Sequence, residues 1–294
     1  GIGPHADSPI LVGLPPARLH YGGSGVGSGV VLTVDSIAEL RALDAGSAAV
    51  VIVNGYYTRG DRGNGLFVWK SASADADDNG MIIRPGSLPP TGRWYRQWQG
   101  EVNIRFFGAK GDGSTDDSTA IAYADAYATT NVKKLLIDEG NYLVTALAPT
   151  ASMIMRPLAR FRWTTSIHPV VYIVVDENDS TVHFDCSLAN YPTIWAPYIR
   201  PEWFLANQLE LAIQSLQSTG GEIRLMSAQY LPLGETYVIT KPSVRIIGEA
   251  RPYIVAGDNH LVSNSGSIIF GPVKVDASGF QLKHVGIDCG SDAC

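Results

Sequence analysis

Six residues near the C-terminal end carry side chains that could do acid–base chemistry. They are three carboxylates, two histidines and a lysine: Asp258, Asp276, Asp288, His260, His284 and Lys274. Two carboxylates about 5–10 Å apart in a groove can hydrolyse a glycosidic bond, and a base can abstract a proton to start an elimination. Asp288 follows an alternating run, Gln281–Ile287, which would place it beside a groove. Each residue also suits a turn or a solvated surface, so we assign no catalytic residue.

A second group of carboxylates, Asp112, Asp116 and Asp117, lies in a Gly-rich segment. Such a cluster could hold a metal or form an acid–base pair. The same residue types are what turns and helix N-caps require, and we favour that structural role. His168 and His183 stand beside apolar strand residues and are expected to be ordinary core or rim histidines.

Other familiar sites fail on spacing or context. The glycines of Gly55–Gly65 imitate a phosphate-binding loop, but the next element is a strand instead of a helix. The acidic turn Asp75–Asp78 lacks the later Gly and Glu of a calcium loop. Cys186, Cys289 and Cys294 are too few for a disulfide framework and too scattered for zinc, which suggests buried thiols in a reducing compartment. We expect no cofactor and no bound metal.

The composition favours a β-rich protein of short elements. Of 294 residues, 45% are hydrophobic and 17% charged, which is enough apolar surface to offset ordering entropy over most of the chain. A net charge of −6 gives no basic field and disfavours nucleic-acid binding. No apolar run approaches the roughly 18 residues of a membrane span, and no signal peptide is visible. Low charge with 31 Gly fits many short strands and turns.

The first hundred residues divide in two. Residues 1–30 carry several prolines and the run Gly22–Gly29, which is a flexible-linker composition; we expect an arm that becomes ordered on a partner. Residues 31–100 are predicted to form a small β-rich domain with one helix. The helix begins at a capping box, Ser36 to Glu39, and strands are expected at Val50–Val53, Leu66–Trp69 and Met81–Arg84.

Residues 101–150 predict a strand over Val102–Phe107, a Gly-rich turn over Gly108–Gly113, and a capped helix. The apolar face of that helix contains Ala120, Ile121, Ala124, Tyr127 and Ala128. Return strands are expected at Leu135–Ile137 and Tyr142–Val144.

A shortened version of this scheme recurs over residues 199–247. Arg105–Ala109 aligns with Glu202–Ala206, and Ala120-Ile121 with Ala212-Ile213. The second helix is predicted over Gln208–Ser218, with return strands at Glu222–Met226, Thr236–Ile239 and Val244–Gly248. Closely spaced short strands follow, which is typical of a β-solenoid. Residues 151–198 contain strands interrupted by prolines and are interpreted as a β insert.

Two segments carry a resemblance to a known family. The pattern from Thr33 through Gly55-Tyr-Tyr, Gly65–Trp69 and Asp78-Asn-Gly80 to Gly92-Arg-Trp94 resembles the small domain that precedes the β-helix of bacteriophage tailspikes. The segment Val102–Ile121, with Gly108-Ala-Lys-Gly-Asp-Gly113 and Asp116-Asp117, is similar to the opening motif of pectate-lyase-like right-handed β-helices. In that family the following helix covers the open end of the solenoid.

The resemblance implies a mainly β fold, in which small α+β N-terminal domains are followed by the capped start of a right-handed parallel β-helix. The expected segments are residues 1–30, an anchoring arm; 31–100, the small domain; 101–150, the first opening motif; 151–198, the β insert; and 199–294, the second opening motif and first rungs. Since the sequence begins at Gly1 and stops after two or three expected rungs, we expect a truncated chain.

The resemblance also implies a function and partners. We expect the virion-proximal part of a homotrimeric tailspike, assembled in the host bacterial cytoplasm, which attaches to phage tail or baseplate proteins through its arm. Host surface polysaccharide would be bound and cleaved by a C-terminal continuation; nucleic-acid binding and membrane insertion are not expected. Two alternatives stay open: a glycoside hydrolase or lyase active within this chain, and a non-catalytic adaptor for another spike.

Overall fold

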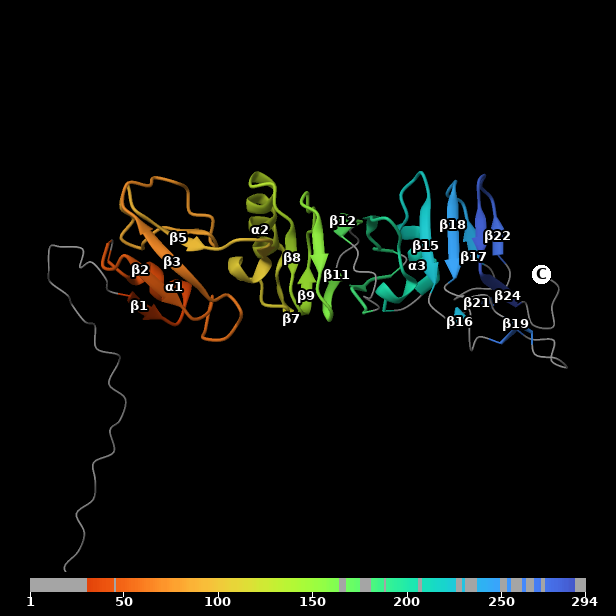
Figure 1. The fold of residues 1–294 in the computed structure, drawn as a ribbon, viewed down its shortest axis with the longest axis horizontal. Coiled ribbons are helices and arrows are strands. Elements are labelled where there is room, and N and C mark those ends of the chain that lie inside the picture. The colour runs from red at the N-terminus through yellow and green to blue at the C-terminus, as the bar shows by residue number, and fades with distance from the viewer. Residues whose placement is uncertain are drawn as a thin grey trace, which may run out of the picture.

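The computed structural model describes residues 31–44, 46–163, 168–174, 181–187, 189–205, 208–225, 229–230, 237–248, 253–254, 261–262, 267–270 and 273–288. The fold is mainly β, with 39% strand and 16% helix. Its elements follow one another along a single long axis in chain order (Figure 1). Among the described residues, no helix has the length and apolarity needed to cross a membrane.

A mixed five-stranded sheet and one short helix form the small domain at one end of this axis (Figure 1). The sheet order is β1-β2-β3-β5-β4. The elements are β1 (Val31–Val34), α1 (Ile37–Ala42), β2 (Val50–Val53), β3 (Gly65–Lys70), β4 (Ile82–Ile83) and β5 (Arg93–Gln97). Ile37 and Leu40 of α1 enter a core that is closed by Phe67 and Trp94.

The predicted cap of α1 is present. The Ser36 side chain accepts a hydrogen bond from the Glu39 amide at 3.1 Å. The Glu39 carboxylate reaches back to the Asp35 amide at 2.8 Å, one residue before the partner that a capping box predicts. One otherwise unpaired amide of the first turn, that of Glu39, is therefore satisfied, and the Asp35 amide just before the helix is paired as well.

Parallel strands stacked in rungs begin immediately after the small domain. Two sheets run side by side through this stack, ordered β14-β12-β10-β8-β6 and β13-β11-β9-β7. The strands are β6 (Val102–Asn103), β7 (Asp112–Asp116), β8 (Leu135–Ile137), β9 (Gly140–Val144), β10 (Met153–Met155), β11 (Ala159–Trp163), β12 (Val170–Val174), β13 (Phe184–Asp185) and β14 (Thr193–Trp195). Since the chain returns to each sheet once per rung, this is a parallel β-helix.

One end of the β-helix is covered by a 3₁₀ turn and a helix, η1 (Ile104–Phe107) and α2 (Ser118–Thr130). The helix buries Ile121, Ala124 and Ala128, as its spacing predicts. The expected strand over Val102–Phe107 is wrong beyond Asn103. The Asn103 side chain accepts a hydrogen bond from the Arg105 amide at 2.9 Å, which turns the chain into η1.

The second scheme repeats the order of 3₁₀ turn, helix and return strand, without a strand between turn and helix like β7, and lies further along the axis (Figure 1). Its 3₁₀ turn and helix are η2 (Pro201–Trp203) and α3 (Gln208–Ser215). The strands are β15 (Gly221–Leu225), β16 (Gln229–Tyr230), β17 (Tyr237–Ile239), β18 (Val244–Gly248), β19 (Tyr253–Ile254), β20 (Leu261–Val262), β21 (Ser267–Phe270), β22 (Val273–Val275), β23 (Gln281–Lys283) and β24 (Val285–Asp288). All pairings in this half are parallel except β19 with β20.

The strands of residues 151–198, interpreted from sequence as an insert, pair with the rungs before them and lead into those after them. β10 pairs with β8 and β11 with β9, and Ile199 bridges to Ile223 of β15. The four prolines that suggested interruption, Pro157, Pro169, Pro192 and Pro197, lie between strands at the corners of rungs. A proline costs no ladder hydrogen bond at such a corner.

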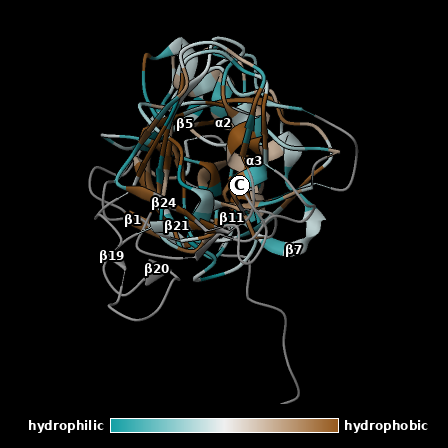
Figure 2. Cartoon of the chain, turned by 90° about the vertical axis from the view of Figure 1, so that its right-hand side faces the viewer, coloured by the Kyte–Doolittle hydropathy of each residue, from teal (hydrophilic) through white to brown (hydrophobic). Residues whose placement is uncertain are grey.

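One continuous apolar core runs through both halves of the β-helix, from Val102 to Ile269. Viewed along the long axis, the successive rungs overlap around this core (Figure 2). Phe184 links the two halves: its ring lies 5.8 Å from that of Trp163 and 5.6 Å from that of Phe204. Each half therefore closes the other's core.

Replacing Phe184, which is fully buried, should destabilise the whole β-helix. We expect Phe184→Ala to lower the free energy of unfolding by about 3–5 kcal/mol, because a large core cavity remains. Denaturant unfolding followed by circular dichroism measures this. Tyr123→Ala, on the exposed side of α2, is the control and should change stability by less than about 0.5 kcal/mol. Equal effects of the two variants would contradict a shared core.

Candidate functional site

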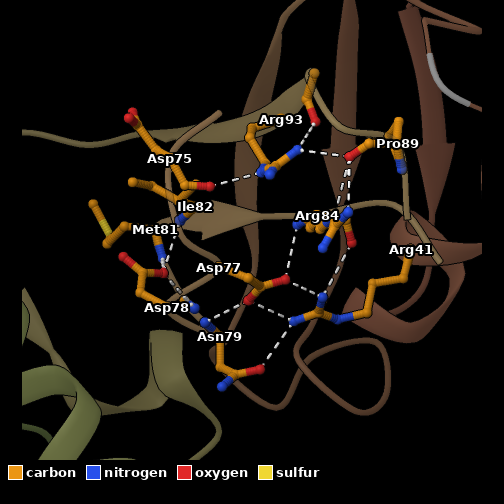
Figure 3. Close-up of polar contacts among 12 residues, drawn as sticks. Arg41, Asp75, Asp77, Asp78, Asn79, Met81, Ile82, Arg84, Pro89 and Arg93 are labelled. Carbon is orange, nitrogen blue, oxygen red and sulfur yellow. Dashed lines mark hydrogen bonds and ion pairs between the residues drawn. The ribbon is translucent and has the colours of Figure 1, made fainter. Parts of the chain in front are cut away.

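The carboxylate of Asp77, in the acidic turn Asp75–Asp78 of the small domain, forms hydrogen bonds within the domain. Arg41 of α1 pairs with Asp77 through both guanidinium nitrogens and also donates to Asn79 at 3.0 Å (Figure 3). Asp77 accepts in addition from the Asn79 and Arg84 amides, each at 2.8 Å. Desolvation raises the pKa of Asp77, but the hydrogen bonds from Arg41 and these amides outweigh it and hold the pKa below its ordinary value. This turn therefore fastens α1 to the β4 edge of the sheet.

The Gly55–Gly65 loop is organised by its own carboxylate. Asp61 accepts hydrogen bonds from the amides of Tyr56, Tyr57, Thr58 and Gly63, at 2.6–3.0 Å. Amides occupied in this way cannot cradle a phosphate, which agrees with the sequence argument against nucleotide binding. A Cβ atom at Gly55 would lie 1.8 Å from the Thr58 carbonyl oxygen, so the close backbone approach expected from the glycine spacing is present.

Arg96 of β5 lies where the small domain meets the β-helix. Its buried guanidinium donates to three backbone carbonyls, those of Gly63, Asn64 and Gly80, at 2.6–3.1 Å. The guanidinium carbon lies 4.5 Å from the ring centroid of Phe106 in η1, a cation–π distance. Burial lowers the pKa of Arg96 to about 9, which leaves it charged at neutral pH.

Aromatic rings and glycines interlock across the same boundary. Tyr57 donates a hydrogen bond to the Gly108 carbonyl at 2.9 Å. A Cβ atom at Gly80 would lie 2.4 Å from the ring of Phe107, and Gly108 would meet the ring of Tyr56 at 2.6 Å. These glycines let the two backbones approach closely enough for the rings to pack. We call this boundary, formed by residues 56, 57, 62, 63, 80, 96 and 105–110, the joint.

Charges at the surface and an arginine below it complete the joint. Arg62 pairs with Glu139 and lies 3.8 Å from Asp138, both in the turn between β8 and β9. Arg105 is nearly buried and donates to the Glu139 carbonyl at 2.6 Å and to the Ala109 carbonyl at 3.3 Å. Arg62 therefore ties the small domain to the turn between β8 and β9, and Arg105 ties η1 to the same turn.

The carboxylates of the Gly-rich turn have structural duties, as expected. Asp117 is buried and accepts from the amides of Lys110 and Gly111, at 2.6 and 2.9 Å; desolvation raises its pKa. Asp112 accepts from the amides and hydroxyls of Ser114 and Thr115, and these bonds keep its pKa far below the ordinary value. Asp117 caps α2 by position only, because its side chain bonds backward to the turn.

Asp116 joins the Gly-rich turn to the first rungs. Its side chain accepts from the hydroxyls of Ser118 and Thr145, each at 2.5 Å. Within the described part of the chain, no three His, Cys, Asp or Glu residues are placed to hold a metal.

The C-terminal acid–base candidates that the structure describes are spread over more than one sheet. Asp276 pairs with Lys274 at 2.9 Å beside β22, whereas Asp288 ends β24 in a different sheet. His284 sits in the tight turn between β23 and β24 with a φ of 55°. Asp258 and His260 lie outside the described residues. That the chain carries no catalytic residue stays a prediction.

The remaining titratable candidates have ordinary surroundings. The buried ring of His183 lies 2.8 Å from the Ala159 carbonyl oxygen, and the exposed ring of His168 lies 3.0 Å from that of Tyr191. Burial raises the pKa of the Cys186 thiol to about 12, so this thiol is unreactive near neutral pH. Cys289 and Cys294 lie outside the described residues.

Sequence reasoning did not identify the joint. Arg96 and Arg105 look like surface cations in the sequence, because nothing local reveals that carbonyls and rings surround them. The available signal was the glycines at positions 63, 80 and 108. They indicated that the backbone is closely approached there, but not which residues approach it.

Residues 33–99 match the family described as "Phage tail protein small four-stranded beta-sheet domain". This segment spans the small domain, from within β1 to just beyond β5. A segment similar to this phage tail domain is therefore joined directly to a parallel β-helix. No curated protein matches the chain.

Solved structures with a similar fold are distant in sequence. Tailspike protein 2 of an Escherichia coli O157:H7 bacteriophage has a TM-score of 0.46 at 14% identity over 86% of this chain. WceF of Pantoea stewartii, described as a glycan biofilm modifying enzyme with a tailspike-like parallel β-helix, has a TM-score of 0.41 at 13% identity over 88%. This chain covers 41% of the length of each.

A third similar structure is a tailspike of Acinetobacter baumannii bacteriophage Fri1, described as a capsular polysaccharide depolymerase. It has a TM-score of 0.37 at 10% identity, over 87% of this chain and 59% of that one.

Arg96 should be the most important cation of the joint. Arg96→Met leaves three backbone carbonyls without their donor, two of them buried, so we expect the free energy of unfolding to fall by about 3 kcal/mol or more. Denaturant unfolding monitored by tryptophan fluorescence measures the change. Arg59→Met is the matched control; its side chain is 70% exposed and pairs with Asp35 at the surface, so it should cost at most about 1 kcal/mol. A loss for Arg96→Met as small as the control's would show that the joint does not depend on this residue.

Stability should depend on pH through Asp77. Because its pKa is lowered on folding, its contribution is complete above the unfolded pKa of about 4 and is lost as the pH falls through the folded pKa. Asp77→Asn should cost about 2 kcal/mol at pH 7, and its stability should converge with that of the wild type at low pH. Thermal unfolding from pH 2 to 7 tests this, with Asp44→Asn on an exposed loop as control. A constant difference at all pH values would contradict the assignment.

Proposed function

We propose that this chain is the virion-proximal part of a trimeric phage tailspike, which attaches a receptor-binding body to the tail. The observation that carries the proposal is the phage tail domain of residues 33–99 fastened by the joint to the end of a parallel β-helix. The Tyr57–Gly108 hydrogen bond, the packing of Arg96 on the Phe106 ring, two interlocked glycines and the ion pairs of Arg62 hold the two domains in one orientation. A connection of this kind suits a protein that must hold an extended receptor-binding body at a fixed angle to the tail.

In this proposal residues 1–30 are the arm that binds phage tail or baseplate proteins. Residues 31–100 form the small domain, and the β-helix that starts near residue 101 leads toward a C-terminal continuation. That continuation would bind host surface polysaccharide during adsorption and cleave it by hydrolysis or elimination. The carboxylates described around the joint support a structural role for this segment, because their hydrogen bonds lie within turns.

Attachment is tested with tails of the encoding phage that lack their spikes. We expect the purified chain to cosediment with these tails, and a variant lacking residues 1–30 to bind at least tenfold more weakly. The variant should keep the unfolding midpoint of the full chain, which separates loss of the arm from loss of the fold. Failure of the full chain to cosediment, or equal binding by both proteins, would overturn the attachment role.

Two further measurements address the alternatives. Incubation with capsular or O-antigen polysaccharide, followed by assays for reducing ends and for unsaturated uronates, would detect hydrolase or lyase activity. We expect neither product from this chain, and either one would favour an enzyme active within it. Copurification with a second, different spike would favour an adaptor.

A further inference from the structure

One outward face of the β-helix is uncharged and largely apolar over three successive strands, β10, β12 and β14. The face belongs to the sheet β14-β12-β10-β8-β6. We call its outward-pointing, solvent-accessible residues the outer ladder: Ile154, Val170, Tyr172, Val174, Thr193 and Trp195. Leu136 of β8 is in register with Ile154 but is only 9% exposed, so it is not part of the ladder. The residues between them, such as Met153, Val171 and Ile194, belong to the core, so strand alternation assigns the ladder to the outside.

The outer ladder is continuous along the stack. Ile154 pairs in register with Val174. Tyr172 pairs with Trp195, and their rings lie 5.8 Å apart. The ladder therefore runs from rung to rung along the long axis, the direction in which β8 and β12 succeed each other in Figure 1.

Much of this apolar surface is open to solvent. Val170 is 41% exposed, Tyr172 and Val174 are each 37% exposed, and Trp195 is 46% exposed. Single exposed apolar residues are ordinary on protein surfaces, but contiguous ones mark interaction surfaces. A partner that covered this face would remove that apolar area from water.

The neighbouring sheet has a different outward face. Its β11 strand points Arg160 and Arg162 outward, and Arg162 lies 3.8 Å from Asp185 of β13. Two such faces brought together would set like charges opposite one another, which is unfavourable. The outer ladder carries no charge, so an identical ladder can lie against it without repulsion.

We propose that the outer ladder is the surface on which a second copy of this chain packs, side by side and with parallel axes. The inference rests on the proposed homotrimer and assigns its contact face. A second copy has the same rung spacing of about 4.8 Å, so side chains of matching rungs meet along the whole ladder. It is also elongated in the same direction, as a partner for a surface that follows the axis must be.

The test is the mass of the purified 294-residue chain in solution, measured by light scattering over a concentration series. We expect three copies for the wild type. Val174→Lys should raise the dissociation constant at least a hundredfold, because the new charges would be buried opposite one another. The matched control is Asn141→Lys, an exposed outward position on β9 in the other sheet, which should leave the mass unchanged.

Circular dichroism checks that the variants fold, and Trp195→Ser is a second, smaller change that should weaken association at least tenfold. Ladder variants that associate as well as the wild type would overturn the inference. The trimer would then be held together by another surface. A monomeric wild type that still binds phage tails would also overturn it, while the proposed attachment role would stand.

Discussion

The backbone and core of a β-helix stay open at the end of the stack until something covers them. Here the cover is composite. Helix α2 lays its apolar face over the first rung, and Met81 of the small domain is buried in the same cluster as the core of the β-helix. The small domain is therefore part of the seal as well as a neighbour, and a fixed joint follows from that requirement.

Covering the end of the β-helix explains why charged side chains at the joint form hydrogen bonds with backbone groups. A buried cation such as Arg96 would be costly alone, but three carbonyls at the loop ends need donors once solvent is excluded. Arg105 does the same for the carbonyls of the Gly-rich turn, and Asp117 for its amides. The charged groups here satisfy backbone polarity instead of acting on a substrate, which is why their abundance does not indicate an active site.

Much of the fold can be predicted from the sequence, because the elements of a solenoid are short and each depends on the residue pattern within it. The spacing of Ile121, Ala124 and Ala128 predicts α2, and strands such as Leu135–Ile137 have the expected bounds. The prolines of residues 151–198 suggested a separate β insert. A proline at the corner of a rung cannot be told in the sequence from one that ends a domain. Arg96 could not be identified, since its partners lie more than thirty positions earlier and sixteen positions earlier in the chain.

The register of the rungs has a consequence for how the chain acquires its structure. Leu135, Met153 and Ile173 stack directly on one another, so each rung needs only the one synthesised roughly twenty residues before it. The capping helix precedes them all. A growing chain can thus seal its first rung and then template the next as each emerges from the ribosome, although parallel pairing is slow when contacts are distant. The order of elements along the axis is also an order in time.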